Sequence, residues 1–262
     1  MTDSPFAVVT GASSGIGLEL ALLFAADGFD LLLCAEDDAL EAAATRCRSA
    51  GVEVRTFRTD LRRSEGTQAL YEAVLATGRP VDAAALNAGV GRGGAFVDAG
   101  LDDLLEVVDL NVRSTVHLLR LLLADMVERD AGRVLVTSSI ASTMPGAFQA
   151  VYNASKSFVQ SLVEAVQNEL KDSSVTITSL MPGPTETNFF HRAGMDDTPM
   201  GRAKKDDPAA VALQGYQAMQ KGEDRVVAAS LGTKAQELVT KVMPDKLKAQ
   251  LHRKVAEPED GS

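Results

Sequence analysis

The sequence predicts an α/β fold, in which one doubly wound parallel sheet carries helices on both faces. Short apolar segments that suit strands alternate with longer segments that suit helices along most of the 262 residues. Each strand-like segment is almost continuously apolar, which is typical of parallel strands that are buried on both faces. No internal repeat, low-complexity tract or linker divides the chain, so we expect a single domain over residues 1–262.

In the first third of the chain the expected strands and helices alternate strictly. Phe6–Thr10 is a short β-type segment, and the helix after it has apolar residues at helical spacing, including Ile16, Leu20, Leu23 and Phe24. Gly28 precedes the second strand, and Pro80 precedes the fourth. The expected order after the first helix is strand Phe29–Ala35, helix Asp38–Ala50, strand Val52–Arg58, helix Ser64–Thr77 and strand Val81–Leu86.

The rest of the chain continues the alternation with longer helices. Many β-branched residues favour a strand after the first long helix. The sixth strand is expected to stop at Met181-Pro182-Gly183-Pro184, because proline cannot continue a strand. The expected elements are helix Leu101–Arg129, strand Gly132–Ser138, helix Val151–Lys171, strand Val175–Leu180, helix Pro208–Gln220 and strand Arg225–Ala229.

Two segments near the C-terminus do not fit the alternation. Residues 182–207 are rich in Gly, Pro, Thr and charge, and a loop of this length favours a substrate lid over a plain surface excursion. In the tail, residues 244–262, the segment Asp245–Val255 places Leu247, Leu251 and Val255 on one helical face. An oligomer arm, a surface-binding helix and an end packed on its own domain all fit this pattern.

Charge and composition exclude several partners. The net charge of −10 repels phosphate backbones and anionic lipid, so we expect neither nucleic acid nor a membrane as a partner. No apolar segment approaches the ~20 residues of a membrane helix, and no secretory leader opens the sequence. The two cysteines, Cys34 and Cys47, favour a reducing, cytoplasmic compartment. The histidines His117, His191 and His252 have no metal-ligand spacing, so we expect no metal.

A glycine-rich turn between the first strand and the first helix predicts a phosphate-binding site. Glycine lets the backbone turn tightly and approach a ligand closely, and the N–H groups and dipole at a helix start attract a pyrophosphate. A tight turn without a ligand would have the same local sequence, but the strand-turn-helix context favours a binding site. The expected contacts come from Gly11, Ser13, Ser14, Gly15, Ile16 and Gly17.

With the motifs that follow it, this turn resembles the compact, single-domain branch of the short-chain dehydrogenase/reductase family. The spacing is Gly-x-x-x-Gly-x-Gly, and the resemblance extends from Ala7 to about Thr187. The later motifs are Asp60-Leu61, Asn87-Ala88-Gly89, Asn111, Ser138-Ser139, Tyr152-x-x-x-Lys156 and Pro182-Gly183-x-x-x-Thr187. The resemblance implies a Rossmann-like fold and hydride transfer between a nicotinamide cofactor and a carbonyl or an alcohol.

The resemblance also implies which side chains hold the cofactor. Asp60 would hold the adenine amino group, Leu61 would flank the adenine ring, and Thr187 would bond the nicotinamide carboxamide. The expected cofactor contacts beyond the glycine turn are Glu36, Asp60, Leu61, Asn87, Ala88, Gly89, Tyr152, Lys156, Pro182, Gly183 and Thr187.

Tyr152 and Lys156 are four residues apart in an expected helix, so they share a face. A free tyrosine is a poor acid or base at neutral pH. A nearby ammonium lowers the pKa of a phenol, so Lys156 would tune Tyr152 for proton transfer. Ser139 follows a strand and therefore lies at the carboxyl end of the sheet, where open α/β sheets bind ligands. The resemblance gives Ser139, rather than Ser138, the substrate oxygen, and gives Asn111 a water-held proton relay to Lys156.

Acidic residues after the second strand bear on the choice between NAD and NADP. An acid there bonds a free ribose 2′-OH and repels a 2′-phosphate. By the resemblance, Ala35 replaces the acid of NAD-using relatives, and Glu36 replaces an arginine of NADP-using relatives. Glu36, Asp37 and Asp38, with no nearby arginine or lysine, favour NAD, although acids also suit the start of the next helix.

We therefore expect an NAD(P)-dependent oxidoreductase acting on a small, moderately apolar carbonyl or alcohol. Candidate pocket residues are Phe148, Gln149, Phe189, Phe190 and Met195. A non-catalytic nucleotide sensor on the same fold is the main alternative. A sugar-nucleotide epimerase or dehydratase is a second, but the roughly 80 residues after Pro182 leave little room for its substrate domain. The family commonly pairs its long helices, here Leu101–Arg129 and Val151–Lys171, which predicts a homodimer or homotetramer.

Overall fold

A computed structural model describes residues 4–228 and 244–258 of the chain, and it contains the predicted parallel sheet. Within these residues seven strands pair in the order β3-β2-β1-β4-β5-β6-β7, and every pair is parallel. The order reverses at β1, which lies between β2 and β4, so the sheet is doubly wound as predicted. The strands are β1 Phe6–Thr10, β2 Asp30–Ala35, β3 Val54–Arg58, β4 Ala83–Leu86, β5 Arg133–Thr137, β6 Thr176–Pro182 and β7 Arg225–Ala228.

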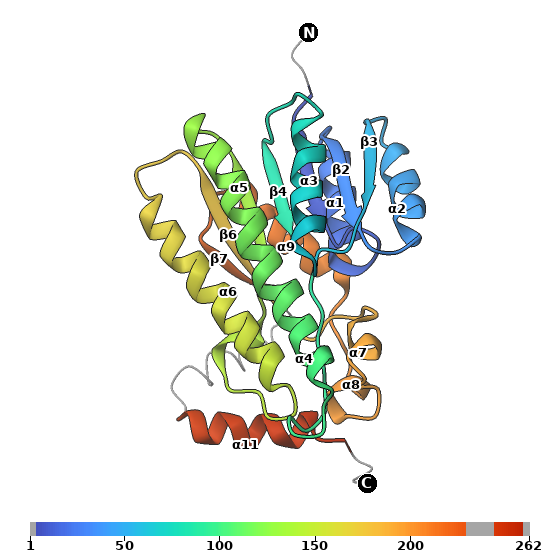
Figure 1. The fold of residues 1–262 in the computed structure, drawn as a ribbon, viewed down its shortest axis with the longest axis vertical. Coiled ribbons are helices and arrows are strands. Elements are labelled where there is room, and N and C mark those ends of the chain that lie inside the picture. The colour runs from blue at the N-terminus through green and yellow to red at the C-terminus, as the bar shows by residue number, and fades with distance from the viewer. Residues whose placement is uncertain (1–3, 229–243, 259–262) are drawn as a thin grey trace.

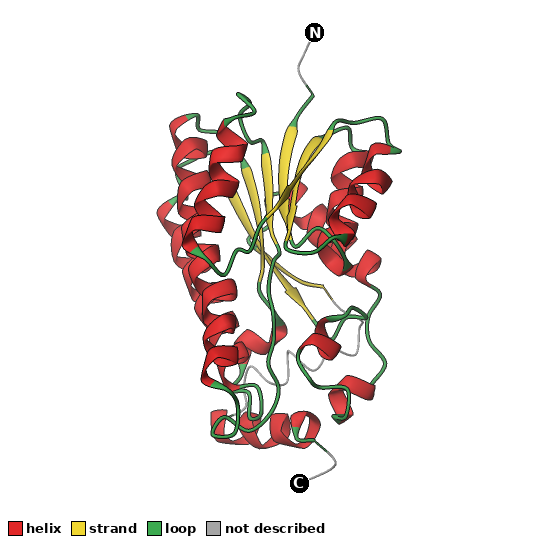
Figure 2. Ribbon diagram, turned by 45° about the vertical axis from the view of Figure 1, so that its right-hand side comes forward, coloured by secondary structure: helices red, strands yellow, loops and turns green. Residues whose placement is uncertain are grey.

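Helices cover both faces of the sheet, as Figure 2 shows. The helices α1, α2 and α9 pack on one face, and α3, α5 and α6 pack on the other. The helices are α1 Gly15–Ala26, α2 Ala39–Arg48, α3 Ser64–Leu75, α4 Leu101–Val108, α5 Ser114–Glu128, α6 Ala150–Glu169, α7 Phe189–Arg192, α8 Pro199–Arg202, α9 Pro208–Gln220 and α11 Asp245–Ala256.

The alternation of side chains along each strand divides the core into two layers. In β1, Ala7 and Val9 belong to the layer under α1 and α9, whereas Phe6 and Val8 belong to the layer under α3 and α5. All four are at most 2% exposed. Burial on both faces explains why the strands read as continuous apolar segments rather than as an alternating pattern.

The long helix expected over Leu101–Arg129 is interrupted. It consists of α4 and α5, joined by a π-helical turn over Asp109–Arg113. After this turn the hydroxyls of Ser114 and Thr115 donate to carbonyl oxygens four residues earlier, a contact that competes with regular helix bonding. Single π turns inside helices are frequent at functional sites, and this one contains Asn111.

The expected end of the sixth strand was wrong by two residues. β6 continues through Met181 and Pro182, and Pro182 pairs with Ala228 of β7. Proline is tolerated there because it is the last residue of the strand, so no further ladder bond needs its missing N–H. The other element ends differ from the expected ones by a few residues, and Ala229 lies outside the described residues.

The C-terminal elements gather at the end of the molecule opposite the N-terminus. Figure 1 shows α7, α8 and α11 beyond the carboxyl ends of the strands, with α4 and the start of α6 beside them. The segment 182–207 contains α7 and α8, and Thr198 caps α8 by accepting a hydrogen bond from the N–H of Gly201 at 3.0 Å. Among the described residues, no helix combines the length and the apolar character needed to cross a membrane.

Candidate active site

A cavity of about 750 Å³ opens at the carboxyl ends of the strands and extends from the start of α1 to α11. Of the predicted site residues, all except Gly17 and Asn111 line this cavity. These two lie just behind its wall. The structure therefore brings the glycine turn, the predicted adenosine contacts and the Ser139, Tyr152 and Lys156 side chains to one site.

The glycine turn has the backbone shape that a phosphate cradle requires. Gly11 and Gly15 have φ of +64° and +56°, a region that glycine adopts without strain. A Cβ on Gly17 would lie 2.1 Å from the carbonyl oxygen of Gly11, so no side chain fits there. Ser14, at the N-terminus of α1, makes no capping bond through its side chain. The first N–H groups of α1 therefore remain available to an anion.

The end of β4 is fixed against β1 and β5 by two threonines. The hydroxyl oxygen of Thr10 accepts hydrogen bonds from the N–H groups of Asn87 and Ala88 at 3.0 and 3.1 Å. Thr137 donates from its hydroxyl to Oδ1 of Asn87 at 3.1 Å. These contacts position Asn87 and Ala88 in the cavity wall next to the glycine turn.

Ser139, Tyr152 and Lys156 meet at the carboxyl end of β5. Ser139 begins a short 3₁₀ turn directly after β5, and Tyr152 and Lys156 lie in the first two turns of α6. The side chains of Ser139 and Tyr152 both line the cavity, and Ser139 is near enough to Tyr152 to affect the pKa of the phenol. Lys156 is 5% exposed, and its Nζ donates to the carbonyl oxygen of Thr137 at 2.8 Å. The Nζ lies 5.9 Å from the centroid of the Tyr152 ring.

Burial controls the titration of this pair. It raises the pKa of Tyr152 to about 12, against a smaller lowering by the Ser139 side chain. It lowers the pKa of Lys156 to about 8. The expected lowering of the Tyr152 pKa by Lys156 is thus not produced by the polypeptide groups alone. Desolvation disfavours both charged forms, and the ammonium is directed at a carbonyl oxygen rather than at the phenol.

Asn111 lies behind the cavity and ties three elements together. Its side chain is 1% exposed. The amide exchanges two hydrogen bonds with the backbone of Val90, each 2.9 Å long, and donates to the hydroxyl of Ser155 at 3.0 Å. The π turn therefore braces the loop after β4 and the helix that carries Lys156. The predicted proton relay to Lys156 remains a prediction.

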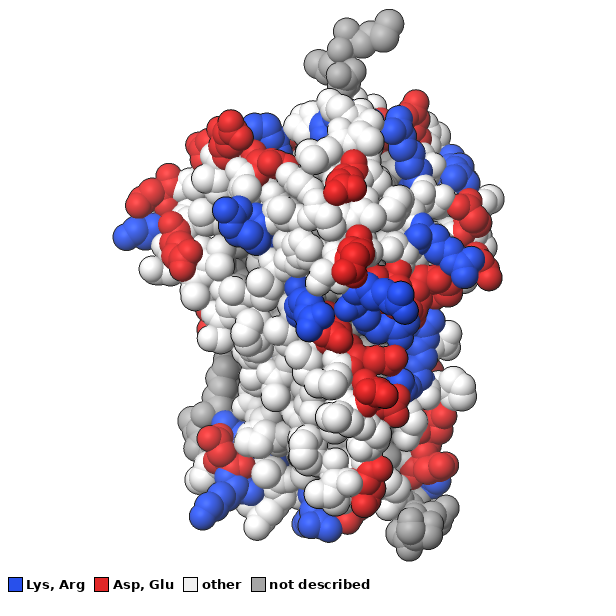
Figure 3. All heavy atoms as spheres, in the orientation of Figure 1, with Lys and Arg blue, Asp and Glu red and all other residues white. Residues whose placement is uncertain are grey.

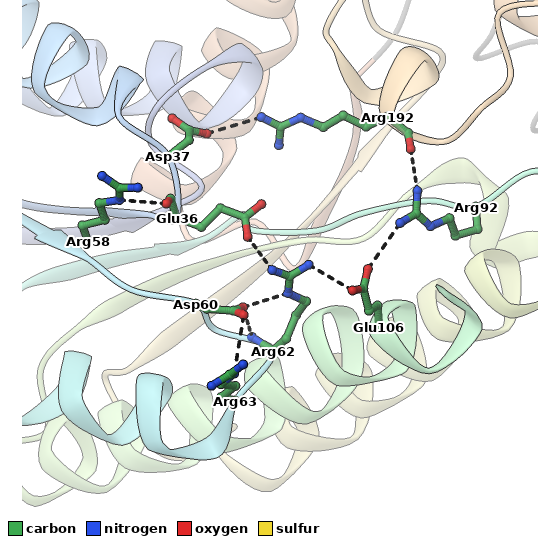
Figure 4. Close-up of polar contacts among 9 residues, drawn as sticks. All are labelled: Glu36, Asp37, Arg58, Asp60, Arg62, Arg63, Arg92, Glu106 and Arg192. Carbon is green, nitrogen blue, oxygen red and sulfur yellow. Dashed lines mark hydrogen bonds and ion pairs between the residues drawn. The ribbon is translucent and has the colours of Figure 1, made fainter. Parts of the chain in front are cut away.

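The end of the cavity near β2 and β3 is rich in ion pairs, as Figure 4 shows. The expectation that no arginine lies near the acids after β2 was wrong. Arg62 pairs with Glu36 at 2.9 Å, Arg58 donates to the carbonyl oxygen of Glu36 at 3.0 Å, and Arg192 pairs with Asp37 at 3.3 Å. These arginines are distant in sequence, and they converge because β2 and β3 end side by side and α7 folds back over them.

Arg62 is the centre of this network. Its guanidinium contacts Asp60 at 2.8 Å, Glu36 at 2.9 Å and Glu106 of α4 at 3.3 Å. Although burial opposes it, hydrogen bonding from Arg62 holds the pKa of Asp60 below its usual value. Asp60, predicted to hold the adenine amino group, accepts from both the N–H and the Nε of Arg62 on one oxygen, Oδ1. The predicted adenine contact stays a prediction.

Only some of the candidate substrate-pocket residues line the cavity. Gln149, Phe189 and Phe190 line the cavity, whereas Phe148 and Met195 do not. Met195 is fully buried, and Phe148 adopts a φ of +62°, which turns its side chain toward α11 instead.

Sequence reasoning missed the contribution of α11 to the site. Lys248, Leu251, His252, Lys254 and Val255 all line the cavity. The apolar stripe drew attention to Leu247, Leu251 and Val255, yet these three are about 40% exposed. The side of α11 that packs on the body contains Lys248, His252 and Ala256. The sequence does not indicate that Lys248 and His252 are buried. Their burial becomes visible only where they contact the loop before α6, at Thr143 and Ala147.

The fold and the site together define a dinucleotide-binding α/β protein with a serine, a tyrosine and a lysine around one cavity. Residues 5–197 match the family model described as short chain dehydrogenase. The chain therefore belongs to the short-chain dehydrogenase/reductase family and is an NAD(P)-dependent oxidoreductase of that family.

Known relatives agree with this family. The chain is 36% identical to 17-beta-hydroxysteroid dehydrogenase type 1 of Homo sapiens over 194 residues, which covers 71% of this chain and 58% of the human protein. A short-chain dehydrogenase/reductase of Burkholderia phymatum, solved with NAD, superposes with a TM-score of 0.83, 25% identity and coverage of 99% and 98% of the two chains. A short-chain dehydrogenase of Sphingobium yanoikuyae, solved with NADPH, has a TM-score of 0.80, 26% identity and coverage of 92% and 96%.

Proposed function

We propose that the chain interconverts a carbonyl and an alcohol on a small, moderately apolar substrate, with Tyr152 as general acid and base. The observation that carries this proposal is the meeting of Ser139 and Tyr152 in the wall of one cavity, with the buried Lys156 one helical turn after Tyr152. Hydroxyls placed in this way suit one carbonyl oxygen that receives both a hydrogen bond and a proton.

The cavity fits a nicotinamide dinucleotide. When bound, NAD(P) supplies or accepts the hydride. The turn from Gly11 to Gly17 would hold the pyrophosphate through backbone N–H groups, because Gly17 has no room for a side chain and Ser14 leaves the start of α1 uncapped. Thr187 lies against Gly15 at the other side of this turn, which supports its proposed contact with the carboxamide.

The proton step follows from the burial of the pair. In reduction, Ser139 orients the substrate oxygen and Tyr152, whose pKa of about 12 keeps it protonated at neutral pH, donates the proton. In oxidation Tyr152 must accept a proton, and positive charge nearby makes this possible. Lys156 supplies that charge, because a group with a pKa of about 8 is mostly protonated at pH 7. In this proposal Asn111 relays protons to Lys156.

We propose NAD as the preferred cofactor. Glu36 and Asp37 line the cavity at the end of β2, where a ribose 2′-phosphate would meet their charge. Arg62, the cation nearest to Glu36, already contacts three carboxylates and is thereby held away from a phosphate. The electrostatic balance at this end therefore favours a free 2′-OH.

We also propose that residues 182–207 form a lid over the substrate. Phe189 and Phe190 of α7 line the cavity, and Arg192 of α7 pairs with Asp37 across its opening. Apolar lining by Met144, Phe189 and Phe190 supports a moderately apolar substrate. The tail, residues 244–262, is part of the same domain in this proposal, since α11 closes the cavity. The two cysteines are free and buried, which fits the expected cytoplasmic location.

A homodimer or homotetramer through α4, α5 and α6 is a further part of the proposal. Leu101 and Leu105 of α4 are 68% and 48% exposed, and Phe158 of α6 is 45% exposed. Figure 3 shows a mostly uncharged surface over the lower part of α6, beside charged side chains that gather near α4. Exposed apolar side chains gathered on one face are typical of an interface.

The direct test is a panel of apolar ketones, aldehydes and alcohols with both cofactors, followed by the absorbance of the reduced nicotinamide. We expect turnover of at least one ketone and its alcohol, with the lower KM for the NAD couple. Tight cofactor binding without turnover of any member would contradict the proposed reaction.

A further inference from the structure

The carboxylates and the lysines of α11 line different ends of the cavity, while Arg192 also lines it and pairs with Asp37. The carboxylates Glu36, Asp37 and Asp60 lie at the end near β2 and β3. At the opposite end α11 contributes Lys248, His252 and Lys254. Among the described residues, no acidic side chain lines this second end. A basic wall in a chain of net charge −10 is a local feature and does not follow from the overall charge.

Three contacts fix the face that α11 turns to the cavity. Lys248 Nζ donates to the carbonyl oxygen of Thr143 at 3.4 Å, and His252 Nδ1 donates to that of Ala147 at 2.9 Å. The guanidinium of Arg253 lies 5.5 Å from the ring centroid of Phe148. All three partners belong to the segment between Ser139 and Tyr152, so α11 is anchored to the part of the chain that carries the reactive hydroxyls.

The lysines retain capacity to bind a ligand. The side chain of Lys248 is 11% exposed, and its ion-pair partner Asp245, at 3.1 Å, is 76% exposed. An ammonium has three donors, and Thr143 and Asp245 engage two of them. Lys254 makes no ion pair within the described part of the chain. His252 already donates from Nδ1, so its neutral ring offers Nε2 as an acceptor, and the positive charge comes from the lysines.

Apolar side chains separate this basic end from the reactive hydroxyls. Leu251 and Val255 of α11 line the cavity together with the lysines, and Met144 and Phe190 line it as well. Building on the proposed function, we propose that the substrate carries an anionic group, a carboxylate or a phosphate, on an apolar body. Lys248 and Lys254 bind this group while the carbonyl or hydroxyl lies at Ser139 and Tyr152.

Matched ketones test this assignment in the full chain loaded with cofactor. The set is a medium-chain keto acid, its methyl ester and the phosphate monoester of a keto alcohol of equal length. Turnover gives kcat/KM for each, and calorimetric titration gives each Kd independently of turnover. Lys248→Met and Lys254→Met remove one charge each, and Lys246→Met on the same helix is the control, since Lys246 does not line the cavity.

We expect the acid or the phosphate to bind more tightly than the ester by about tenfold or more, and to have a correspondingly higher kcat/KM. A charge-assisted hydrogen bond contributes about this much. The compound with the larger advantage over the ester shows whether the site binds a carboxylate or a phosphate. The ratio should fall toward one in Lys248→Met or Lys254→Met and persist in Lys246→Met. Equal Kd values for acid, phosphate and ester, or ratios unchanged in both lysine variants, would overturn the anion site. If the anions bind more tightly than the ester but nothing turns over, the proposed reaction fails while the anion site stands.

Discussion

At the scale of single residues, the site is built from groups whose burial costs stability. Lys156 has a pKa near 8 in the folded chain, against 10.5 when exposed. Between these values the unfolded chain binds more protons than the folded chain, so the free energy of unfolding rises with pH in that range. Below pH 8 the folded protein carries the whole penalty of a buried ammonium. A group kept at such a cost is typical of a functional site.

Removing the charge of Lys156 should therefore stabilise the fold. We expect Lys156→Met to raise the free energy of unfolding at pH 7 by about 1–3 kcal/mol, a gain that shrinks as pH rises from 8 to 10.5. Denaturant unfolding at pH 7 and pH 10 measures both values. Lys171→Met, at an exposed position after α6, is the control and should change little. A variant that is less stable than the wild type at pH 7 would refute this account of Lys156.

Glu36 is the residue on which the proposed cofactor preference depends. We expect the wild type to bind NADH more tightly than NADPH, and Glu36→Gln to narrow that gap by about tenfold. The substitution removes a charge at the ribose end and frees one contact of Arg62. Fluorescence titration of both cofactors measures the ratio, with Glu53→Gln, an exposed acid just before β3, as control. Tighter binding of NADPH by the wild type would reject the preference.

At the scale of elements, the proposed lid is held both by polar contacts and by buried apolar side chains, since Phe190, Ala193 and Met195 pack with Ala256 of α11. Arg192 of α7 pairs with Asp37, and its carbonyl oxygen accepts a hydrogen bond from Arg92 at 2.9 Å. The N–H of Gly93 donates to the carbonyl oxygen of Ala193 at 2.8 Å. Half-exposed ion pairs contribute little to stability, so the buried apolar contacts hold the proposed lid more strongly than the Arg192–Asp37 pair does.

Loosening the ion pair should be visible as faster amide exchange in the lid. We expect Arg192→Gln to increase hydrogen exchange over residues 189–202 by up to about fivefold, the equivalent of a partly exposed ion pair. His191→Gln is the matched control, because the partner of His191 is Asp196 within the same segment. Identical exchange in Arg192→Gln and the wild type would mean that this pair does not hold the lid.

The elements also show how far sequence reasoning extends. Apolar segments sufficed to predict a doubly wound parallel sheet, and the glycine positions sufficed to predict the tight turn before α1, because both depend on local patterns. The π turn at Asn111, the extension of β6 through Pro182 and the convergence of Arg62 and Arg192 on Glu36 and Asp37 were not predicted. Each depends on neighbours that are distant in sequence. The same holds for Lys248 and His252, whose burial is visible only once α11 lies on the loop before α6.

At the scale of the whole molecule, the candidate active site lies at one end of the fold, where the strands have their carboxyl ends. The proposed interface includes α4 and the start of α6, which lie at the same end of the molecule as the cavity. If this face pairs two chains, each copy would brace the helix that carries Tyr152 and Lys156. Assembly and activity would then depend on the same surface.

Charge on that face should break the assembly. We expect a dimer or tetramer for the wild type and a monomer for the double variant Leu105→Glu and Phe158→Glu, because burying two carboxylates in an apolar interface is strongly unfavourable. Light scattering after gel filtration measures the mass. Leu213→Glu, at an exposed position on α9, should leave the mass unchanged. A monomeric wild type would contradict the proposed interface.

The most direct measurement of the central claim is turnover by Tyr152→Phe with bound cofactor. The substitution removes one hydroxyl, and the loss of a positioned general acid and base lowers turnover by about 10²–10⁴-fold. Cofactor affinity should stay close to the wild-type value, and Tyr71→Phe, at a tyrosine that bonds Asp125 away from the cavity, should keep its activity. Near-wild-type turnover by Tyr152→Phe with cofactor bound would contradict the assignment of Tyr152 and the mechanism derived from it.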